Sequence, residues 1–185
     1  MRIIRAHEQV IVPWKNGGGT ATNIVASPEG AGFGAFDWRL SGAHVAAAGP
    51  FSHFPHTDRT MLILSEGELV LHGLGPEAAT LTKASDPFEF PGDVPVIAAV
   101  PKGAIDDLNV MVDRRRCRSK VWRTALPFAE TLRPKGTLLV YCESGEISVG
   151  SEVLARGDTA VSTEPLTTSA APGSQAIVIL ITPKS

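Results

Sequence analysis

Three stretches in the first half of the chain carry side chains suited to ligand binding or catalysis. The first runs from Trp14 to Thr20 and contains three consecutive glycines, Gly17 to Gly19, preceded by Lys15 and Asn16. Glycines in a tight turn can present successive backbone N–H groups to an anion, and Lys15 would add a positive charge. The lysine precedes the glycines, so this is not a nucleotide-binding P-loop. The pattern predicts an anion-binding turn, with a flexible loop as the alternative.

The second stretch is a predicted strand over residues 36–45. Alternation along a strand places Asp37, Arg39 and Ser41 on one face and apolar side chains on the other. An arginine on the inner face of a β-barrel needs an acidic partner, because an unpaired buried charge is costly. That partner could be Asp37 or, through a bidentate contact, the carboxylate of a ligand. An Asp–Arg pair on the surface is the alternative.

The third stretch, residues 49–60, is a predicted loop that leads into a strand and holds His53, His56 and Asp58. Two histidines and a carboxylate can ligate a metal, but histidines three residues apart on a loop have no fixed geometry. The phenylalanines and prolines around them favour a packed loop, so we predict no metal site. A later strand adds polar side chains that could face the same cavity: Asp106, Asp107 and Asn109.

The elements that must position these residues are predicted to be short β-strands. The chain has 18 glycines and 14 prolines, which divide it into short segments rich in β-branched residues. Sustained helical periodicity is absent. The clearest predicted strands are residues 9–12, 61–64, 68–71, 94–97, 138–141 and 176–181. This pattern indicates an all-β sandwich or barrel.

An internal repeat divides the predicted strands into two sets. Leu62–Leu71 reads like Leu139–Val149, and each predicts a hairpin of two strands around a glycine. The same turn signals follow in the same order, Gly92-Asp93 and Pro101–Gly103 in the first half, Gly157-Asp158 and Pro172-Gly173 in the second. This order favours two double-sheet barrels over chance similarity. We predict an N-terminal barrel over residues 1–113, a linker over 114–127 and a smaller C-terminal barrel over 128–185.

Charge and hydropathy exclude several classes of protein. The linker is basic, but the formal net charge of the chain is −2, so a solvated connecting strand is favoured over a phosphate-binding surface. The near-neutral balance also argues against a nucleic-acid or membrane partner. No apolar run approaches the roughly 20 residues that cross a bilayer, and no signal peptide is evident, which predicts a cytoplasmic location. Cys117 and Cys142 lack the CxxC spacing of a zinc site and are expected to be ordinary thiols.

Five short motifs, in order along the chain, together resemble the HutD/Ves family: residues 13–20, 37–41, 49–55, 58–60 and 107–111. The resemblance implies a bicupin, an all-β fold of two tandem cupin-like β-barrels packed together. It also implies a link to bacterial histidine utilisation and no established catalytic activity. Where the family usually has glycine, this chain has His56, and the HxH-Glu-His metal set of many cupins is missing. The predicted ligand-binding residues are Trp14, Lys15, Asn16, Gly18, Arg39, Ser52, His56, Arg59 and Asn109.

These observations predict a protein that binds a small carboxylate, such as formylglutamate or a related histidine-degradation intermediate, and that has a regulatory role without a cofactor. The alternative is a cupin enzyme, an isomerase or hydrolase, with His44, His53 or His56 as the general base. A third interpretation is a structural or protein-interaction role for an empty barrel. Because the sheet edges of such barrels often pair, a homodimer is also expected.

Overall fold

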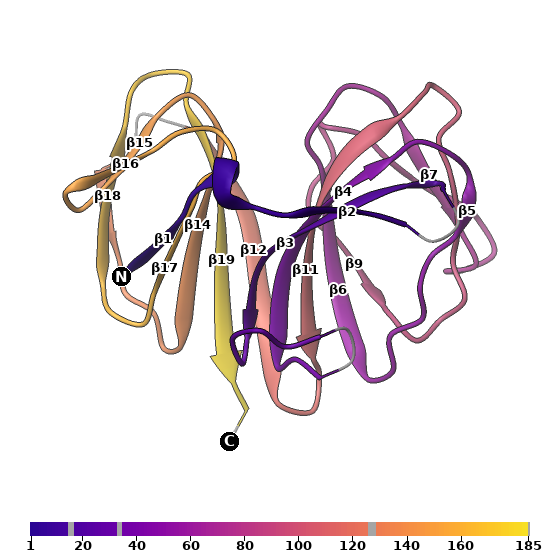
Figure 1. The fold of residues 1–185 in the computed structure, drawn as a ribbon, viewed down its shortest axis with the longest axis horizontal. Helices are drawn as coiled ribbons and strands as arrows, with labels where there is room; N and C mark the ends of the chain where they lie inside the picture. Colours follow the sequence, from indigo (N-terminus) through magenta and orange to yellow (C-terminus); the bar gives the residue numbers. More distant parts are fainter. Residues whose placement is uncertain (15–16, 33–34, 126–128, 185) are drawn as a thin grey trace. The chain divides into compact units, whose positions relative to one another are not determined.

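The computed structural model describes residues 1–14, 17–32, 35–125 and 129–184, and the chain divides into two compact units. The N-terminal unit is Val10–Cys117, and the C-terminal unit combines Met1–Gln9 with Arg118–Ser185 (Figure 1). The sequence had suggested a linker over 114–127. In the structure, Cys117–Ala125 is a strand, β12, and it lies in a sheet of the C-terminal unit.

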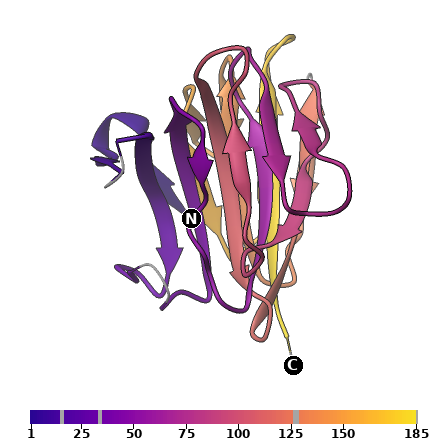
Figure 2. The same cartoon turned by 90° about the vertical axis from the view of Figure 1, so that its right-hand side faces the viewer.

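The N-terminal unit consists of two antiparallel sheets (Figure 2). The six-stranded sheet has the order β2-β3-β4-β11-β6-β9 and is built from β2 (Ile11–Pro13), β3 (Gly19–Ser27), β4 (Trp38–Val45), β6 (Thr57–Ile63), β9 (Phe88–Pro91) and β11 (Ile105–Asp113). The four-stranded sheet has the order β5-β10-β7-β8 and is built from β5 (Gly49–Pro50), β7 (Leu69–His72), β8 (Ala79–Leu81) and β10 (Ile97–Ala99).

The C-terminal unit also consists of two sheets. The five-stranded sheet has the order β1-β17-β14-β19-β12, with β1 (Arg2–Ile4), β14 (Thr137–Ser144), β17 (Thr159–Ser162) and β19 (Gln175–Pro183) beside β12. The four-stranded sheet has the order β13-β18-β15-β16, with β13 (Ala129–Leu132), β15 (Ile147–Val149), β16 (Glu152–Leu154) and β18 (Leu166–Ala170). A 3-10 turn, η1 (Ala6–Glu8), follows β1.

The internal repeat predicted from the sequence is present in the strand order. The run β4-β11-β6-β9 of the N-terminal unit corresponds to β12-β19-β14-β17 of the C-terminal unit, and β5-β10-β7-β8 corresponds to β13-β18-β15-β16. The turns at Gly103 and Gly173, which lead into β11 and β19, are equivalent and both have a positive φ.

Two details of the predicted repeat are wrong. The strands β6 and β7 were expected to form a hairpin, but they lie in different sheets, as do β14 and β15. The Gly-Asp steps are not equivalent either, because Gly92-Asp93 follows β9 whereas Gly157-Asp158 precedes β17. Both errors have one cause: glycine marks a change of chain direction without specifying which sheet the next strand joins.

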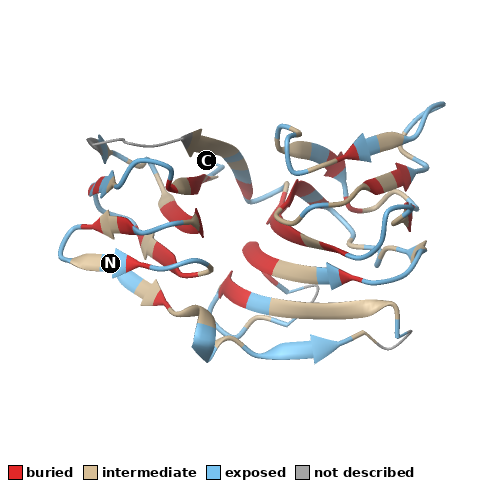
Figure 3. Cartoon of the chain, turned by 90° about the horizontal axis from the view of Figure 1, so that it is seen from above, coloured by how far each residue is buried: buried red, intermediate tan, exposed pale blue. Residues whose placement is uncertain are grey.

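The all-β class is confirmed, whereas the two-barrel arrangement is not. Among the described residues no sheet closes on itself, and each sheet has two edge strands. In the N-terminal unit the apolar core lies between the two sheets and includes Met61, Ile63, Leu69, Leu71 and Phe90. Buried residues alternate with more exposed ones along the strands at several places (Figure 3).

The thiols of Cys117 and Cys142 are both buried and are not joined in a disulfide. Burial raises the pKa of the Cys142 thiol to about 11. Within the part of the chain that the structure describes, no helix has the length and apolar character needed to cross a membrane.

Candidate functional site

Three neighbouring strands, β4, β11 and β6, bring polar side chains onto one face of the six-stranded sheet. Arg39 of β4 and Arg59 of β6 both lie opposite Met111 of β11, and Ser41 lies opposite Asn109. Opposite residues in an antiparallel pair have side chains on the same face, and every second residue of a strand shares that face. The pairing therefore gathers five polar residues, which we call the buried polar cluster: Arg39, Ser41, Arg59, Asp107 and Asn109.

The face that carries the buried polar cluster points into the N-terminal unit. Its apolar members Met61 and Ile63 pack in one buried cluster with Leu69 and Leu71 of the four-stranded sheet. The exposed fractions of the charged members are 4% for Arg39, 6% for Arg59 and 2% for Asp107. Burying charged groups opposes folding unless partners compensate. These residue types are therefore better explained by function than by stability.

Arg59 is held in place by aromatic rings. Its guanidinium carbon lies 4.9 Å from the centroid of the Phe90 ring, 5.0 Å from that of Phe51 and 5.7 Å from that of Phe54. Its Nε donates a long hydrogen bond of 3.5 Å to Oδ1 of Asn109. Cation–π contacts of this kind stabilise a desolvated guanidinium. Burial lowers the pKa of Arg59 to about 10, so the group is still positively charged at neutral pH.

A glycine lets the chain approach Arg59 closely. A Cβ atom added at Gly92 would lie 3.1 Å from the carbonyl oxygen of Thr57 and 3.2 Å from Cδ of Arg59. The N–H of Gly92 donates to that same carbonyl at 2.7 Å. The absence of a side chain at this position thus helps to fix the path of the Arg59 side chain.

Asp107 is a buried carboxyl group with an unsatisfied oxygen. Its Oδ1 is fully buried and accepts no hydrogen bond from the residues that the structure describes. Burial raises the pKa of Asp107 to about 7, an effect that the positive charge of Arg59 partly opposes. Among the described residues, no ion pair joins Asp107 to Arg59. An unsatisfied buried acceptor is uncommon in native proteins and calls for an explanation such as a bound molecule.

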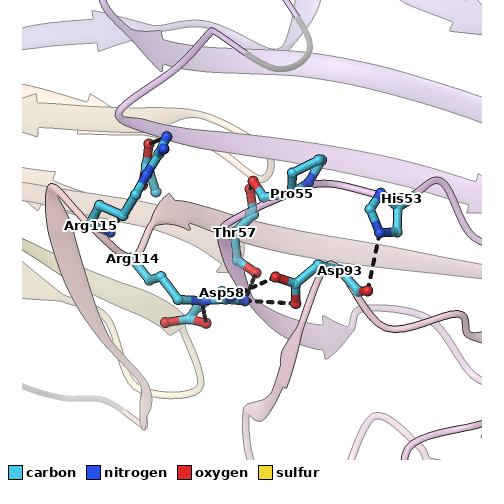
Figure 4. A network of polar contacts seen from close by, with 8 residues as sticks. His53, Pro55, Thr57, Asp58, Asp93, Arg114 and Arg115 are labelled. Atoms are coloured by element: carbon cyan, nitrogen blue, oxygen red, sulfur yellow. Dashed lines mark hydrogen bonds and ion pairs between the residues drawn. The ribbon is translucent and has the colours of Figure 1, made fainter.

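A network around Arg114 supports the edge of the sheet that carries Arg59 (Figure 4). Arg114 Nη1 and Nη2 donate to the two carboxylate oxygens of Asp93 at 2.6 and 3.0 Å, and Nε donates to Asp58 at 2.7 Å. Its Nη2 also donates to the carbonyl of Thr57 at 2.7 Å. The hydrogen bonds from Arg114 hold the pKa of Asp93 at about 2. Arg114 therefore ties the start of β6 to the residues after β9.

Several arginines of the basic run, which was expected to be a solvated connecting strand, pair with acidic residues. Besides Arg114, Arg115 pairs with Asp113 at 2.7 Å and Arg116 pairs with Asp37 at 2.6 Å. In the C-terminal unit Arg123 pairs with the buried Glu143 at 3.0 Å. The ion pair between Arg116 and Asp37 also corrects the suggestion that Asp37 is the acidic partner of Arg39. The carboxylate of Asp37 points to a different arginine, 79 positions away in the sequence.

Of the residues predicted for the site, the structure brings Arg39, Arg59 and Asn109 together in the buried polar cluster. Trp14 is partly buried against the core of the same unit. Ser52 and His56 are exposed. His56 has a φ of 58°, the left-handed region that favours glycine. Lys15 and Asn16 lie outside the described residues.

In the described part of the glycine-rich turn, the glycines meet requirements of the backbone conformation. Gly17 has a φ of 71°, and its N–H donates to the carbonyl of Trp14 at 3.1 Å. The Gly18 carbonyl accepts hydrogen bonds from the N–H groups of Ala46 and Ala47. A Cβ atom at Gly19 would collide with the carbonyl oxygen of His44. Chain geometry therefore accounts for Gly17 and Gly19 without an anion.

The histidines of the first half have partners outside the buried polar cluster. His53 Nε2 lies 3.1 Å from the carbonyl oxygen of Asp93, and His44 Nδ1 lies 2.8 Å from the carboxylate of Asp106. His44 and Asp106 are both half-exposed. Within the described ranges, no three His, Cys, Asp or Glu side chains are grouped so as to hold a metal ion.

The sequence analysis noted Asp107 but did not select it for the site. It suggested Phe51 as an apolar wall of the pocket but missed Phe54 and Phe90 beside Arg59. Asp107 and Asn109 are two residues apart on a predicted strand, so alternation alone places them on one face, opposite to that of Asp106. Phe90 could not have been found in this way, because its position beside Arg59 depends on the pairing of β6 with β9.

The sequence of this chain is similar to those of several known proteins. The family model described as HutD matches residues 6–179. Protein Ves of Citrobacter koseri is 37% identical over 142 residues, which cover 76% of this chain and 72% of that protein. An uncharacterised 21.2 kDa protein from the hutC 3′ region of Pseudomonas putida is 31% identical over 153 residues, covering 80% and 77%.

Solved structures give the same assignment. The structure of HutD from Pseudomonas fluorescens SBW25 superposes with a TM-score of 0.85 at 26% identity and covers 100% of this chain and 99% of that chain. A cupin 2 conserved barrel domain protein from Leptotrichia buccalis has a TM-score of 0.54 at 13% identity, covering 89% and 88%, which supports the cupin-like fold alone. By the extent of the family match and the identity to these relatives, the chain belongs to the HutD family.

Proposed function

We propose that this protein binds a small carboxylate, formylglutamate or a related histidine-degradation intermediate, and that binding has a regulatory role in histidine utilisation. The observation that carries the proposal is Arg59, a buried and charged guanidinium with one long hydrogen bond among the described residues. A guanidinium is a planar, multiple donor that matches a carboxylate in a bidentate contact. Arg39 on the same face adds a second positive charge.

Family membership supports the metabolic context of the proposal. The chain shares the HutD model with HutD of P. fluorescens, and a relative is encoded in the hutC 3′ region of P. putida. We also propose that each unit is a cupin-like barrel, so that the whole chain is a bicupin. The corresponding strand orders of the two units support this arrangement.

The test is calorimetric and thermal titration of the purified protein with formylglutamate, with glutarate and with the uncharged glutaramide. A ligand at about 100 times its Kd should raise the free energy of unfolding by about 2.7 kcal/mol. Arg59→Gln should weaken carboxylate binding by about 30-fold or more, because it removes a buried charge that pairs with the ligand. The matched control is Arg118→Gln, which changes an exposed arginine in the C-terminal unit.

Binding of the carboxylates but not of glutaramide, lost in Arg59→Gln and kept in Arg118→Gln, would support the proposal. Equal binding to both variants would place the ligand elsewhere. If none of the three compounds binds the wild-type protein, the carboxylate-binding role is wrong.

The alternative is a cupin enzyme that acts on a related small molecule, and one observation favours it. The histidines first considered as general bases, His44, His53 and His56, are exposed, whereas the buried Asp107 has a pKa of about 7. A general base works best when its pKa is near the working pH. Incubating each bound compound with the protein and following it by NMR tests this alternative. Turnover that disappears in Asp107→Asn would establish an enzyme.

A further inference from the structure

Two buried groups of opposite charge face the same interior without pairing with each other. Arg59 and Asp107 lie on the same face of the six-stranded sheet, and among the described residues no ion pair joins them. Within the described part of the chain, the Arg59 guanidinium makes one hydrogen bond, to Asn109, and Oδ1 of Asp107 makes none. Open donors and an open acceptor therefore coexist in one buried region.

The register explains why the two groups do not meet. Arg59 lies opposite Met111, and its side chain reaches along the sheet to Asn109, two residues nearer to Asp107. Asp107 lies two residues beyond Asn109, a separation of about 7 Å along the strand. The rings of Phe51, Phe54 and Phe90 lie around the guanidinium, within 5.7 Å of its carbon atom. A small molecule that contacts both groups would satisfy the open donors and the open acceptor together.

We propose that Asp107 accepts a hydrogen bond from an N–H or O–H group of the ligand whose carboxylate is held by Arg59. The site would then select amino-, acylamino- or hydroxycarboxylates over plain dicarboxylates. The proposal rests on the carboxylate-binding function above, and it adds a specificity-determining residue to it.

The chemistry of the two groups requires this kind of ligand. A second carboxylate beside Asp107 would bring like charges together or require protonation, whereas an N–H group satisfies the open oxygen. Leaving a buried acceptor unpaired carries a penalty that a ligand without a donor cannot remove. Such a site rejects the analogue that lacks the donor more strongly than a purely apolar site could.

The experiment compares two ligands that differ in one substituent, formylglutamate and glutarate, at pH 8, where Asp107 is largely ionised. The wild-type protein should bind formylglutamate about tenfold more tightly or better, the range for a hydrogen bond to a charged group. Asp107→Leu should reduce this preference to near unity while glutarate binds as tightly as before or more tightly. The matched control, Asp106→Leu, changes the half-exposed neighbour on the opposite face and should keep the preference.

A second measurement needs no variant and keeps the proposal testable if Asp107→Leu does not fold. In 2-formyloxyglutarate an oxygen replaces the N–H of formylglutamate, so this compound should bind the wild-type protein at least about tenfold more weakly. Equal affinity for the two compounds would overturn the inference, as would a preference for formylglutamate that survives in Asp107→Leu. If both compounds bind equally and both require Arg59, the proposed function stands and this inference alone fails. If neither binds, both fail.

Discussion

Arg59 is buried and still charged, and its surroundings show how both properties are possible. Three aromatic rings lie within 5.7 Å of the guanidinium carbon, and they supply electrostatic attraction where water is excluded. The flat guanidinium fits these rings in a way that an ammonium group would not. If Arg59 binds the proposed carboxylate, this arrangement would orient its donors in advance and so reduce the entropy lost on binding.

Asp107 makes the stability of the protein depend on pH in a direction opposite to that of the paired aspartates. Burial raises the pKa of Asp107 to about 7 in the folded protein, well above the value of about 3.9 expected in an unfolded chain. Between these values the folded state binds more protons than the unfolded state. Its contribution to stability is therefore fully present below pH 4 and is lost as the pH rises through 7.

Asp107→Asn should remove this dependence. We expect the free energy of unfolding of the wild-type protein, measured relative to the variant, to fall between pH 4 and pH 8 by an amount on the order of 4 kcal/mol. Urea unfolding at four or five pH values measures it. The positive charge of Arg59 and the neighbouring Asp106 also act on Asp107. The control is Asp106→Asn, which keeps Asp107 and should therefore retain the pH dependence. Parallel pH profiles for the wild type and Asp107→Asn would contradict the assignment.

At the scale of elements, the position of Arg59 depends on how β6 and β9 are held together. Asp58 lies opposite Pro91, and Arg59 lies opposite Phe90, just before the turn at Gly92. Arg114 spans the same turn through Asp58, Thr57 and Asp93. A change in this turn should therefore affect the site through the position of the Arg59 side chain.

Gly92→Ala is the most direct test of this support. The added methyl group would lie 3.1 Å from the Thr57 carbonyl and 3.2 Å from the Arg59 side chain, so backbone or side chain must move. We expect a loss of about 1 to 3 kcal/mol in the free energy of unfolding, together with weaker carboxylate binding. Gly75→Ala is a matched control, because a Cβ atom there would have nothing within 4 Å. Urea unfolding and calorimetric titration of both variants measure the difference, and equal stability of the two would show that the close approach is unimportant.

Much of the fold could be predicted because the strands carry local signals. Apolar and β-branched runs predicted β7, β14 and β19 closely, and β-branched Val94–Ile97 predicted a strand that in fact begins at Ile97. Alternation also placed Arg39 and Ser41 on one face correctly. The repeat in turn signals correctly indicated two equivalent sets of strands.

The rest depends on pairings between distant residues, which local signals do not contain. Asp37 pairs with Arg116 rather than with its neighbour Arg39, and β6 and β7 separate into different sheets. The aromatic rings around Arg59 come from a loop and from β9, more than 30 positions apart in the sequence. The sequence identified Asp107 as a polar residue of a predicted strand. Its burial follows from the position of that strand in the middle of a sheet, which the sequence does not specify.

At the scale of the whole molecule, two units with corresponding strand orders differ in the chemistry of their interiors. In the C-terminal unit, paired residues of β14 and β19 such as Val140 and Val178, or Cys142 and Ala176, belong to an apolar core cluster. The corresponding strands of the N-terminal unit carry Arg59, Asp107 and Asn109 on their inner face. We therefore propose that the ligand binds in the N-terminal unit.

The first nine residues belong to the C-terminal unit although they precede the N-terminal unit in the sequence. The strand β1 pairs with β17 from Arg2 to Ile4. Arg5 donates to Asp158 at 2.9 Å, to Glu152 at 2.8 Å and to the carbonyl of Val153 at 2.8 Å. The N–H of Ala6 donates to the same carboxylate of Asp158 at 2.8 Å. The side chain of Asp158 is almost fully buried, and the hydrogen bonds from Arg5 and Ala6 are the main interactions that offset the cost of burying this carboxylate.

Arg5→Gln should therefore lower the Tm of the protein by a few degrees, because it leaves the buried carboxylate of Asp158 without its charged partner. Deletion of residues 1–9 should lower it further, since the edge of β17 then loses its neighbouring strand as well. The control is Glu8→Gln, an exposed residue of the same segment. Thermal unfolding measures all three changes, and unchanged Tm values for Arg5→Gln and for the deletion would show that this segment does not stabilise the unit.

Carboxylate affinity should stay within about twofold in Arg5→Gln, because Arg59 and Asp107 belong to the other unit. A parallel loss of affinity and Tm would instead mean that the two units are energetically coupled, and the C-terminal unit would then take part in controlling the site.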